Sequence, residues 1–179
     1  MTAGYGAANA AIPCRENTLN YGAPSEMATK KSSAAKQPQQ PDPHRVFKGG
    51  MPTSLGMRLV SITKKKVVAE MMVKDQHRNW NGRVNGGAIM SLADATGAAG
   101  AVANMPPHHR GGTLESKTNF FAAGQGPVLR AVAIPLHIGR TTSVWQTTIT
   151  NSGDGSRVAI VTQTQMCLPA RQVPAQEDE

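Results

Sequence analysis

The sequence predicts an α+β protein in which one long helix packs against an antiparallel sheet of about six strands. A small-residue stretch, residues 86–103, has the start and stop signals of a helix: asparagines precede it and two prolines follow it. Two β-prone segments precede this stretch and four follow it, so helix and strand do not alternate along the chain. This order favours an antiparallel sheet with a helix on one face over a doubly wound parallel sheet.

The elements are expected in a simple order. Residues 55–62 and 66–73 form two strands joined by a polar turn, and the helix then occupies residues 86–103. Four more strands are expected at residues 113–121, 128–138, 141–150 and 157–168, with a clear turn at residues 151–155. One helix cannot cover six strands alone. We therefore expect the sheet to curve around it and to dimerise through an edge.

Because side chains alternate between the two faces of a strand, the sequence predicts which residues share a face in two of these strands. Ser143, Trp145, Thr147 and Ile149 share one face of their strand. In the preceding strand an apolar face carries one charged exception, Arg130, among Val128, Val132, Ile134 and Leu136.

Composition divides the chain into three parts. Residues 1–50 are rich in Ala, Pro, Gln, Ser and Lys without an apolar period, which predicts a disordered extension. Residues 51–170 are expected to form one domain, and residues 171–179 an acidic tail. The first 30 residues lack the continuous apolar core of a secretory signal. The two cysteines, Cys14 and Cys167, lie far apart, so we expect a reducing cytoplasm.

The net charge of +8 favours anionic partners. Nucleic acid is disfavoured because the basic residues are dispersed, apart from the run at residues 64–66, and only 4% of residues are aromatic. No spacing of ligands predicts a metal, and His108-His109 stands without a Cys or carboxylate cluster. A membrane span is not expected either, since residues 86–103 contain four glycines and a carboxylate.

That carboxylate, Asp94, is the strongest functional signal in the chain. It is the one charge in a stretch where 11 of 18 residues are Gly or Ala. An unpaired charge inside an apolar helix costs several kcal/mol unless it is hydrogen-bonded or protonated. Asp94 is therefore a candidate catalytic group. The alternative is a carboxylate that is satisfied by Thr or backbone donors at a dimer seam and does no chemistry.

Several short motifs occur together in a specific order: Asn79, Asn85-Gly86-Gly87, Ser91 to Asp94, the strand at residues 113–124, the bend at residues 137–141 and the turn at residues 153–155. With them, the chain resembles the hotdog-fold acyl-CoA thioesterases, in particular the PaaI-type branch of phenylacetic acid degradation. The resemblance covers roughly residues 52–168. It implies a long central helix wrapped by a curved antiparallel sheet, a dimer or dimer of dimers, an acyl-CoA substrate and no cofactor.

The resemblance also implies site residues. Asp94 takes the place of the catalytic carboxylate, as general base or nucleophile. Gly86 and Gly87 take the place of the backbone N–H donors that face the thioester oxygen, which agrees with the positive end of a helix dipole. Asn79 matches an amide that positions water or substrate, and Thr113 matches a hydroxyl near the carboxylate.

One motif departs from the family. Asn85 stands where the family usually has His; Asn is a favoured N-cap but does not titrate near neutral pH. Among the substrate-binding candidates, Arg110 and Arg140 are candidates for contact with the coenzyme A phosphates, although a solvated surface role is favoured for each. Trp80 either lines the acyl pocket or anchors its loop.

Helix geometry adds a constraint. Gly87 and Asp94 are seven residues apart, which is roughly 10 Å along a helix axis. One thioester therefore cannot touch both within one subunit. If both serve one reaction, each site combines Gly86, Gly87 and Asn79 of one subunit with Asp94 and Thr113 of another.

The leading hypothesis is hydrolysis of a small, medium or aryl acyl-CoA to the free acid and coenzyme A. The alternative is a non-catalytic acyl-CoA-binding hotdog module, acting as a sensor or partner subunit, which the Asn85 departure keeps open. A hydratase ranks last, because the His and acidic pair of that chemistry is missing.

Overall fold

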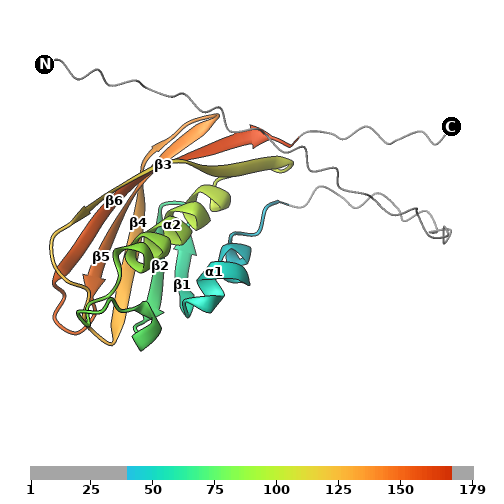
Figure 1. Ribbon diagram of the computed structural model, residues 1–179. Coiled ribbons are helices and arrows are strands. Elements are labelled where there is room, and N and C mark those ends of the chain that lie inside the picture. The colour runs from blue at the N-terminus through green and yellow to red at the C-terminus, as the bar shows by residue number, and fades with distance from the viewer. Residues whose placement is uncertain (1–39, 171–179) are drawn as a thin grey trace, which may run out of the picture. The chain divides into compact units, whose positions relative to one another are not determined.

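The computed structural model describes residues 40–170. One long helix, α2, lies against a sheet of six strands (Figure 1). The elements in chain order are the 3-10 helix η1 (Pro43–Phe47), α1 (Gly50–Ser54), β1 (Met57–Thr63), β2 (Lys66–Met72), the 3-10 helix η2 (Asp75–His77), α2 (Gly86–Ala103), β3 (His109–Phe120), β4 (Val128–Ile138), β5 (Thr142–Asn151) and β6 (Arg157–Pro169).

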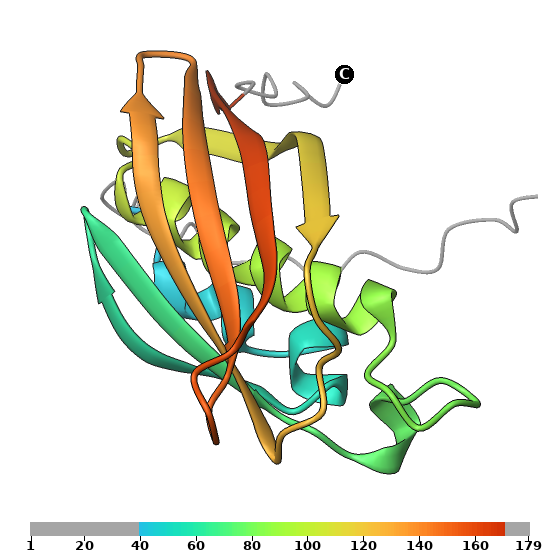
Figure 2. The same ribbon diagram turned by 90° about the vertical axis from the view of Figure 1, so that its left-hand side faces the viewer.

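The sheet has the strand order β1-β2-β4-β5-β6-β3, and every neighbouring pair is antiparallel. The sheet is twisted and curved, and α2 lies behind it along its inner face (Figure 2). The predicted α+β architecture is therefore confirmed. β1 and β3 are the two edges, and β3, with 12 residues, is the longer one.

The bounds of α2 follow from its two ends. Asn85 is the N-cap, and its side chain accepts a hydrogen bond from the Gly87 N–H over 2.7 Å. At the other end Asn104 donates its side-chain amide to the carbonyl of Gly100 over 2.9 Å, and Pro106 follows. The helix covers residues 86–103, as predicted.

Small residues let α2 approach the sheet closely. A Cβ placed on Gly100 would lie 2.5 Å from the ring of Trp145, and a Cβ on Gly97 would lie 2.6 Å from the side-chain amide of Gln163. Both neighbours are fully buried. Glycine at these two positions is therefore a packing requirement, because a methyl group would displace the side chain beneath it.

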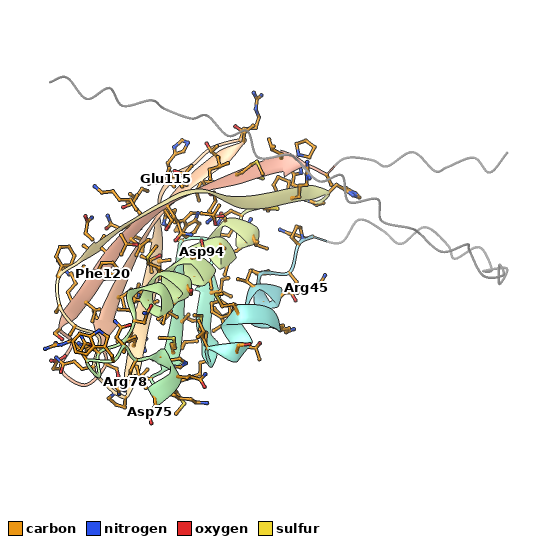
Figure 3. All side chains as sticks on the ribbon, viewed as in Figure 1. Arg45, Asp75, Arg78, Asp94, Glu115 and Phe120 are labelled. Atoms are coloured by element: carbon orange, nitrogen blue, oxygen red, sulfur yellow. The ribbon has the colours of Figure 1, made fainter. Side chains whose placement is uncertain are left out.

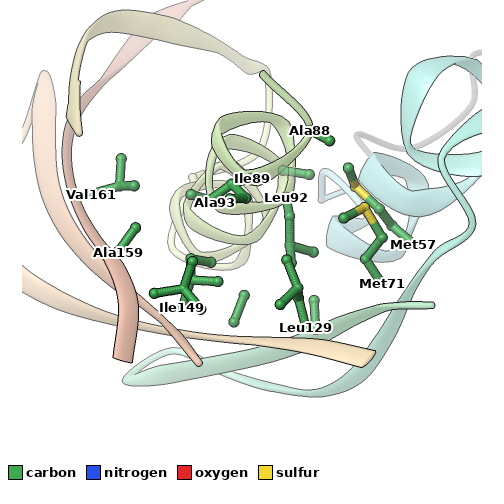
Figure 4. Close-up of a cluster of buried hydrophobic side chains, with 14 of the residues drawn as sticks. Met57, Met71, Ala88, Ile89, Leu92, Ala93, Leu129, Ile149, Ala159 and Val161 are labelled. Atoms are coloured by element: carbon green, nitrogen blue, oxygen red, sulfur yellow. The ribbon is translucent and has the colours of Figure 1, made fainter. Parts of the chain in front are cut away.

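The core lies between α2 and the sheet. Ile89, Leu92 and Ala93 of the helix face strand residues that include Leu129 and Ile149 (Figure 4). Ser143, Trp145, Thr147 and Ile149 are all buried on one face of β5, which confirms the predicted grouping.

In β4 the apolar face predicted by alternation is the outer one. Leu129, Ala131 and Ala133 are fully buried instead, and Ile134 is 43% exposed. The close approach of α2 to the sheet favours small side chains at Ala131 and Ala133. Arg130, the charged exception on the outer face, donates to Glu70 of β2 over 2.6 Å, and Arg58 of β1 also pairs with Glu70.

Ordered structure begins before the predicted boundary at residue 50. Asp42 caps η1 by accepting from the His44 N–H over 3.0 Å, and Pro43 begins it. Val46 and Phe47 then pack against the core. The prediction of disorder is thus wrong for residues 43–47, whose apolar pair was too short to give a period. Residues 1–39 and the tail at 171–179 lie outside the described residues.

Two features of residues 40–170 bear on the function classes considered above. None of the helices there has the length and apolarity needed to cross a membrane. Within the same residues, no group of three His, Cys, Asp or Glu side chains is placed to hold a metal ion.

Candidate active site

Asp94 lies on the side of α2 that faces β3, and it is half-buried. Figure 3 shows it close to the ribbon of that strand. Thr113 of β3 donates its hydroxyl proton to Oδ1 of Asp94 over 2.8 Å. The sequence pairs these residues only by family resemblance, and the structure brings them into direct contact.

Two glutamines of β6 complete the surroundings of this carboxylate. Gln165 donates its side-chain amide to the Thr113 hydroxyl over 3.0 Å. Gln163 donates to the main-chain oxygen of Asp94 over 3.3 Å and to its Oδ1 over 3.4 Å. Both amides are buried, at 0% and 3% exposure. The result is a polar network, from β6 through β3 to α2, that fixes one oxygen of Asp94.

Sequence reasoning missed Gln163 and Gln165. The sequence of β6 contains a signal: it reads Thr162-Gln163-Thr164-Gln165, and both glutamines fall on the same face as Val161. Two long amides two residues apart on a core-facing side need buried partners. That pattern marks a polar site inside an otherwise apolar layer.

The second carboxylate oxygen of Asp94 remains available. Oδ1 takes the donors described above, and within residues 40–170 no group donates to Oδ2. Asp94 also lines a cavity of about 330 Å³ between α2, η1, α1 and β3. An oriented carboxylate beside a mostly apolar cavity is able to take a proton from a water molecule or attack a carbonyl carbon.

The start of α2 forms a second cluster. Asn85 uses its carbonyl oxygen to cap Gly87, and its Nδ2 donates to Oδ1 of Asn79 over 2.5 Å. The Gly87 N–H is therefore occupied by its own cap. Among the described residues, the Gly86 N–H has no partner, and it stands at the positive end of the helix. Gly86 is thus the better placed of the two oxyanion donors.

His77 supports this second cluster from behind. Its carbonyl accepts the Asn85 N–H over 2.7 Å, and its Nδ1 accepts the Lys74 N–H over 3.0 Å. The ring is 1% exposed. Burial, assisted by the nearby Lys74 cation, lowers the pKa of His77. The neutral ring is the form that accepts at Nδ1, so His77 orders the loop before α2.

The two clusters do not meet within one subunit. Gly87 and Asp94 sit seven positions apart on an unbroken helix, roughly 10 Å along its axis. A separate cavity of about 510 Å³ lies at the start of α2, where Asn85 and Gly87 line it. The structure thus keeps the oxyanion candidates and the carboxylate apart, as the helix spacing predicts.

The three predicted substrate-binding residues lie away from Asp94. Trp80 is 98% exposed at the end of the molecule where α2 begins. Arg110 and Arg140 are exposed near the opposite end of the helix: each lines a hollow that includes Ala101. The hollow of Arg110 also includes Thr113, so this arginine is the nearer of the two to the carboxylate network.

Comparison with known proteins identifies the fold and family. The thioesterase superfamily profile matches residues 81–158, which contain Asn85, Gly86, Gly87, Asp94 and Thr113. A 1,4-dihydroxy-2-naphthoyl-CoA hydrolase of Listeria monocytogenes is 30% identical over 102 residues. That alignment covers 57% of this chain and 83% of the Listeria protein.

Solved structures agree with this assignment. A hypothetical thioesterase protein of Streptococcus pneumoniae with coenzyme A is 27% identical, with a TM-score of 0.58, over 65% of this chain and 88% of that one. The E. coli PaaI protein from the phenylacetic acid degradation operon has a TM-score of 0.64 at 23% identity, over 72% and 92% of the two chains, and so supports the fold. This chain belongs to the thioesterase superfamily and has the hotdog fold.

Proposed function

We propose that the protein hydrolyses acyl-CoA thioesters to the free acid and coenzyme A, with Asp94 as the group that activates water or attacks the carbonyl. The observation that carries this proposal is the state of Asp94. It is the one carboxylate of α2, Thr113 and Gln163 hold its Oδ1, and its other oxygen has no donor among the described residues.

In the general-base form of the reaction, Asp94 accepts a proton from water while the water oxygen bonds to the carbonyl carbon. The carbonyl oxygen gains negative charge, and the Gly86 N–H at the start of α2 stabilises it. The carbon–sulfur bond then breaks, and the proton goes to the departing thiolate. In the nucleophilic form, the Asp94 carboxylate bonds to the carbonyl carbon, the carbon–sulfur bond breaks and the coenzyme A thiolate leaves. Water then hydrolyses the mixed anhydride to the free acid and the Asp94 carboxylate, and the released proton goes to the thiolate.

We further propose a homodimer that joins the two clusters. β3 is an edge strand of 12 residues, nearly all exposed, and it presents Leu114 and Phe120 at 58% and 50% exposure. A long edge with exposed apolar side chains favours pairing with a second copy. The helix spacing then supports a site made from Gly86 and Asn79 of one subunit and Asp94 and Thr113 of the other. A dimer of dimers is compatible with this unit.

The proposed substrate class is a small, medium or aryl acyl-CoA. The Listeria relative is named for an aryl-CoA substrate, and the Streptococcus structure was solved with coenzyme A. Arg110 and Arg140, in a chain of net charge +8, suit the phosphates of coenzyme A. The proposed chemistry needs no metal or organic cofactor, and we expect it to take place in the cytoplasm.

A second candidate is an acyl-CoA-binding module without turnover. One observation favours it. Asn85 stands in the position of the family His, and its side chain accepts a hydrogen bond from the Gly87 N–H and donates one to Asn79. If the family His contributes by protonation, this chain lacks that contribution.

Release of free thiol from a panel of aliphatic and aromatic acyl-CoA thioesters tests the proposal. We expect wild-type turnover and a loss of at least about a hundredfold in Asp94→Asn. Asp75→Asn is the matched control, because that carboxylate is exposed and lines neither cavity. Wild-type binding without turnover would instead support the module, and full activity of Asp94→Asn would remove Asp94 from the mechanism.

A further inference from the structure

The two cavities along α2 meet at two side chains. The cavity beside Asp94 and the cavity beside Gly87 share two lining residues, Met51 and Ser91. Ser91 belongs to α2 and lies between the two clusters, and Met51 reaches toward it from α1. Together they form the partition between the two spaces.

The partition is held by weak contacts. The Ser91 hydroxyl lies 3.4 Å from the sulfur of Met51 and 2.8 Å from the carbonyl oxygen of Gly87. It has a single proton, so it donates to one of them at a time, and the backbone oxygen is the stronger acceptor. The Met51 side chain is therefore not fixed by a strong bond, and it is 63% exposed.

The other methionines of the region differ from Met51. Met71 is fully buried in the core, and Met57 is 6% exposed on the wall of the Asp94 cavity. Met90 lines that same cavity but not the second one. A change at Met51 alone would alter the connection between the cavities without removing a core side chain.

We infer that Met51 sets the length of the acyl group that the Asp94 cavity accepts, by closing it off from the cavity at the start of α2. This inference rests on the proposed function, since it assigns the cavity beside the catalytic carboxylate to the acyl group. The Asp94 cavity has a volume of about 330 Å³ and is partly open to solvent. Removal of the Met51 side chain would join it to a further space of about 510 Å³.

Methionine suits this position. An unbranched, flexible thioether adapts its shape to the ligand, whereas a branched or aromatic side chain would make a rigid wall. The site therefore takes apolar acyl groups up to a limit that depends on the side chain at residue 51. Longer chains need that side chain to be shorter.

Kinetics with straight-chain acyl-CoA thioesters, from butanoyl to palmitoyl, tests the inference. We expect Met51→Ala to raise the ratio of kcat/KM for palmitoyl to kcat/KM for butanoyl at least about tenfold, and Met51→Trp to lower it. Met72→Ala is the matched control: Met72 is also exposed, at 56%, but lines neither cavity. An unchanged ratio in Met51→Ala would overturn the inference.

Calorimetry with S-alkyl coenzyme A thioethers separates this inference from the proposed function. These compounds bind without being hydrolysed, so the measurement does not depend on turnover. If Met51→Ala strengthens binding of the long thioether relative to the short one, Met51 sets the length even if no thioester is cleaved. If the relative affinities equal those of the wild type, the inference fails, whatever the activity of the enzyme.

Discussion

Thr113 on β3 donates a hydrogen bond from its hydroxyl to Oδ1 of Asp94 on α2 over 2.8 Å, and it accepts a hydrogen bond from the Gln165 amide over 3.0 Å. The hydroxyl thus serves as a link between a buried amide of β6 and the carboxylate. The Gln165 amide occupies an acceptor position of the Thr113 hydroxyl, so the hydroxyl hydrogen points toward Asp94. This relationship orients the group that we propose to perform the reaction.

The first prediction concerns this link. Thr113→Val keeps the shape of the side chain and removes the donor, so we expect kcat to fall about tenfold, the lower end for a lost hydrogen bond to a charged group. Thr113→Ser keeps the hydroxyl and should retain most of the activity. Steady-state kinetics checks both variants, and equal kcat values in Val and Ser would show that the hydroxyl is not needed.

The second prediction tests whether Gln163 orients the Asp94 carboxylate or stabilises the fold. Its Nε2 contacts Asp94, whereas its buried Oε1 has no hydrogen-bond partner among the described residues. Gln163→Met should therefore lower kcat several-fold while leaving Tm unchanged or raised, because an unsatisfied buried acceptor disappears. The mutation removes the donor to Asp94 and keeps the volume.

Gln146→Met is the matched control for that experiment. Gln146 lies on the neighbouring strand β5, on the opposite face of the sheet from Trp145. Its substitution should leave kcat unchanged. A Gln163→Met variant that loses stability and activity together would show that Gln163 acts as a structural residue.

The sequence predicted α2 well because its signals are local. Asn85 caps the helix and Pro106 follows its last turn, and both act within a few residues of the ends they define. The six strands were also recognisable, although β3 begins at His109, four residues before its predicted start. The predicted contact of Asp94 with Thr113 came from family resemblance rather than from spacing.

The features that the sequence did not reveal depend on tertiary packing. The inner face of β4 is formed by Leu129, Ala131 and Ala133, and the two alanines fit where α2 approaches the sheet closely. The larger apolar residues, predicted to form one apolar face, lie on the outer face. Gln163 reaches Asp94 across 69 residues of sequence, a contact that follows only from placing β6 beside β3.

The third prediction concerns the cap of α2. Asn85→Ala removes the acceptor for the Gly87 N–H and should lower the free energy of unfolding by about 1 kcal/mol. Asn85→Ser keeps a cap but loses the hydrogen bond to Asn79, so it should preserve stability. Any change in its activity then measures the contribution of the Asn85–Asn79 hydrogen bond. Urea unfolding with thiol-release assays measures both, and an Asn85→Ala variant as stable as wild type would contradict the prediction.

The fourth prediction is a pH dependence of stability from His77. Burial lowers its pKa in the folded state, so below the ordinary value of about 6.5 the unfolded chain binds a proton that the folded chain resists. The contribution is complete above that pH, and the free energy of unfolding should fall as the pH decreases through this region. Urea midpoints between about pH 7.5 and pH 5.5 measure it.

His77→Asn is the control for the pH series. Its side-chain oxygen can still accept the Lys74 N–H, but it does not titrate in this range. The variant should therefore show a smaller decrease in stability over the same interval. An equal decrease in both proteins would assign the effect to the other histidines.

The fifth prediction tests whether the active site is shared between subunits. Gly86→Pro removes the N–H proposed for the oxyanion, and proline is tolerated at the first helical position, so the variant should fold and lose activity. Asp94→Ala should also be inactive, because it removes the catalytic carboxylate. When both are refolded together, half of the dimers are mixed and each mixed dimer has one complete site, so activity should return to about a quarter of wild type. No recovery, with mixed dimers demonstrated by mass spectrometry, would place both groups in one subunit's site.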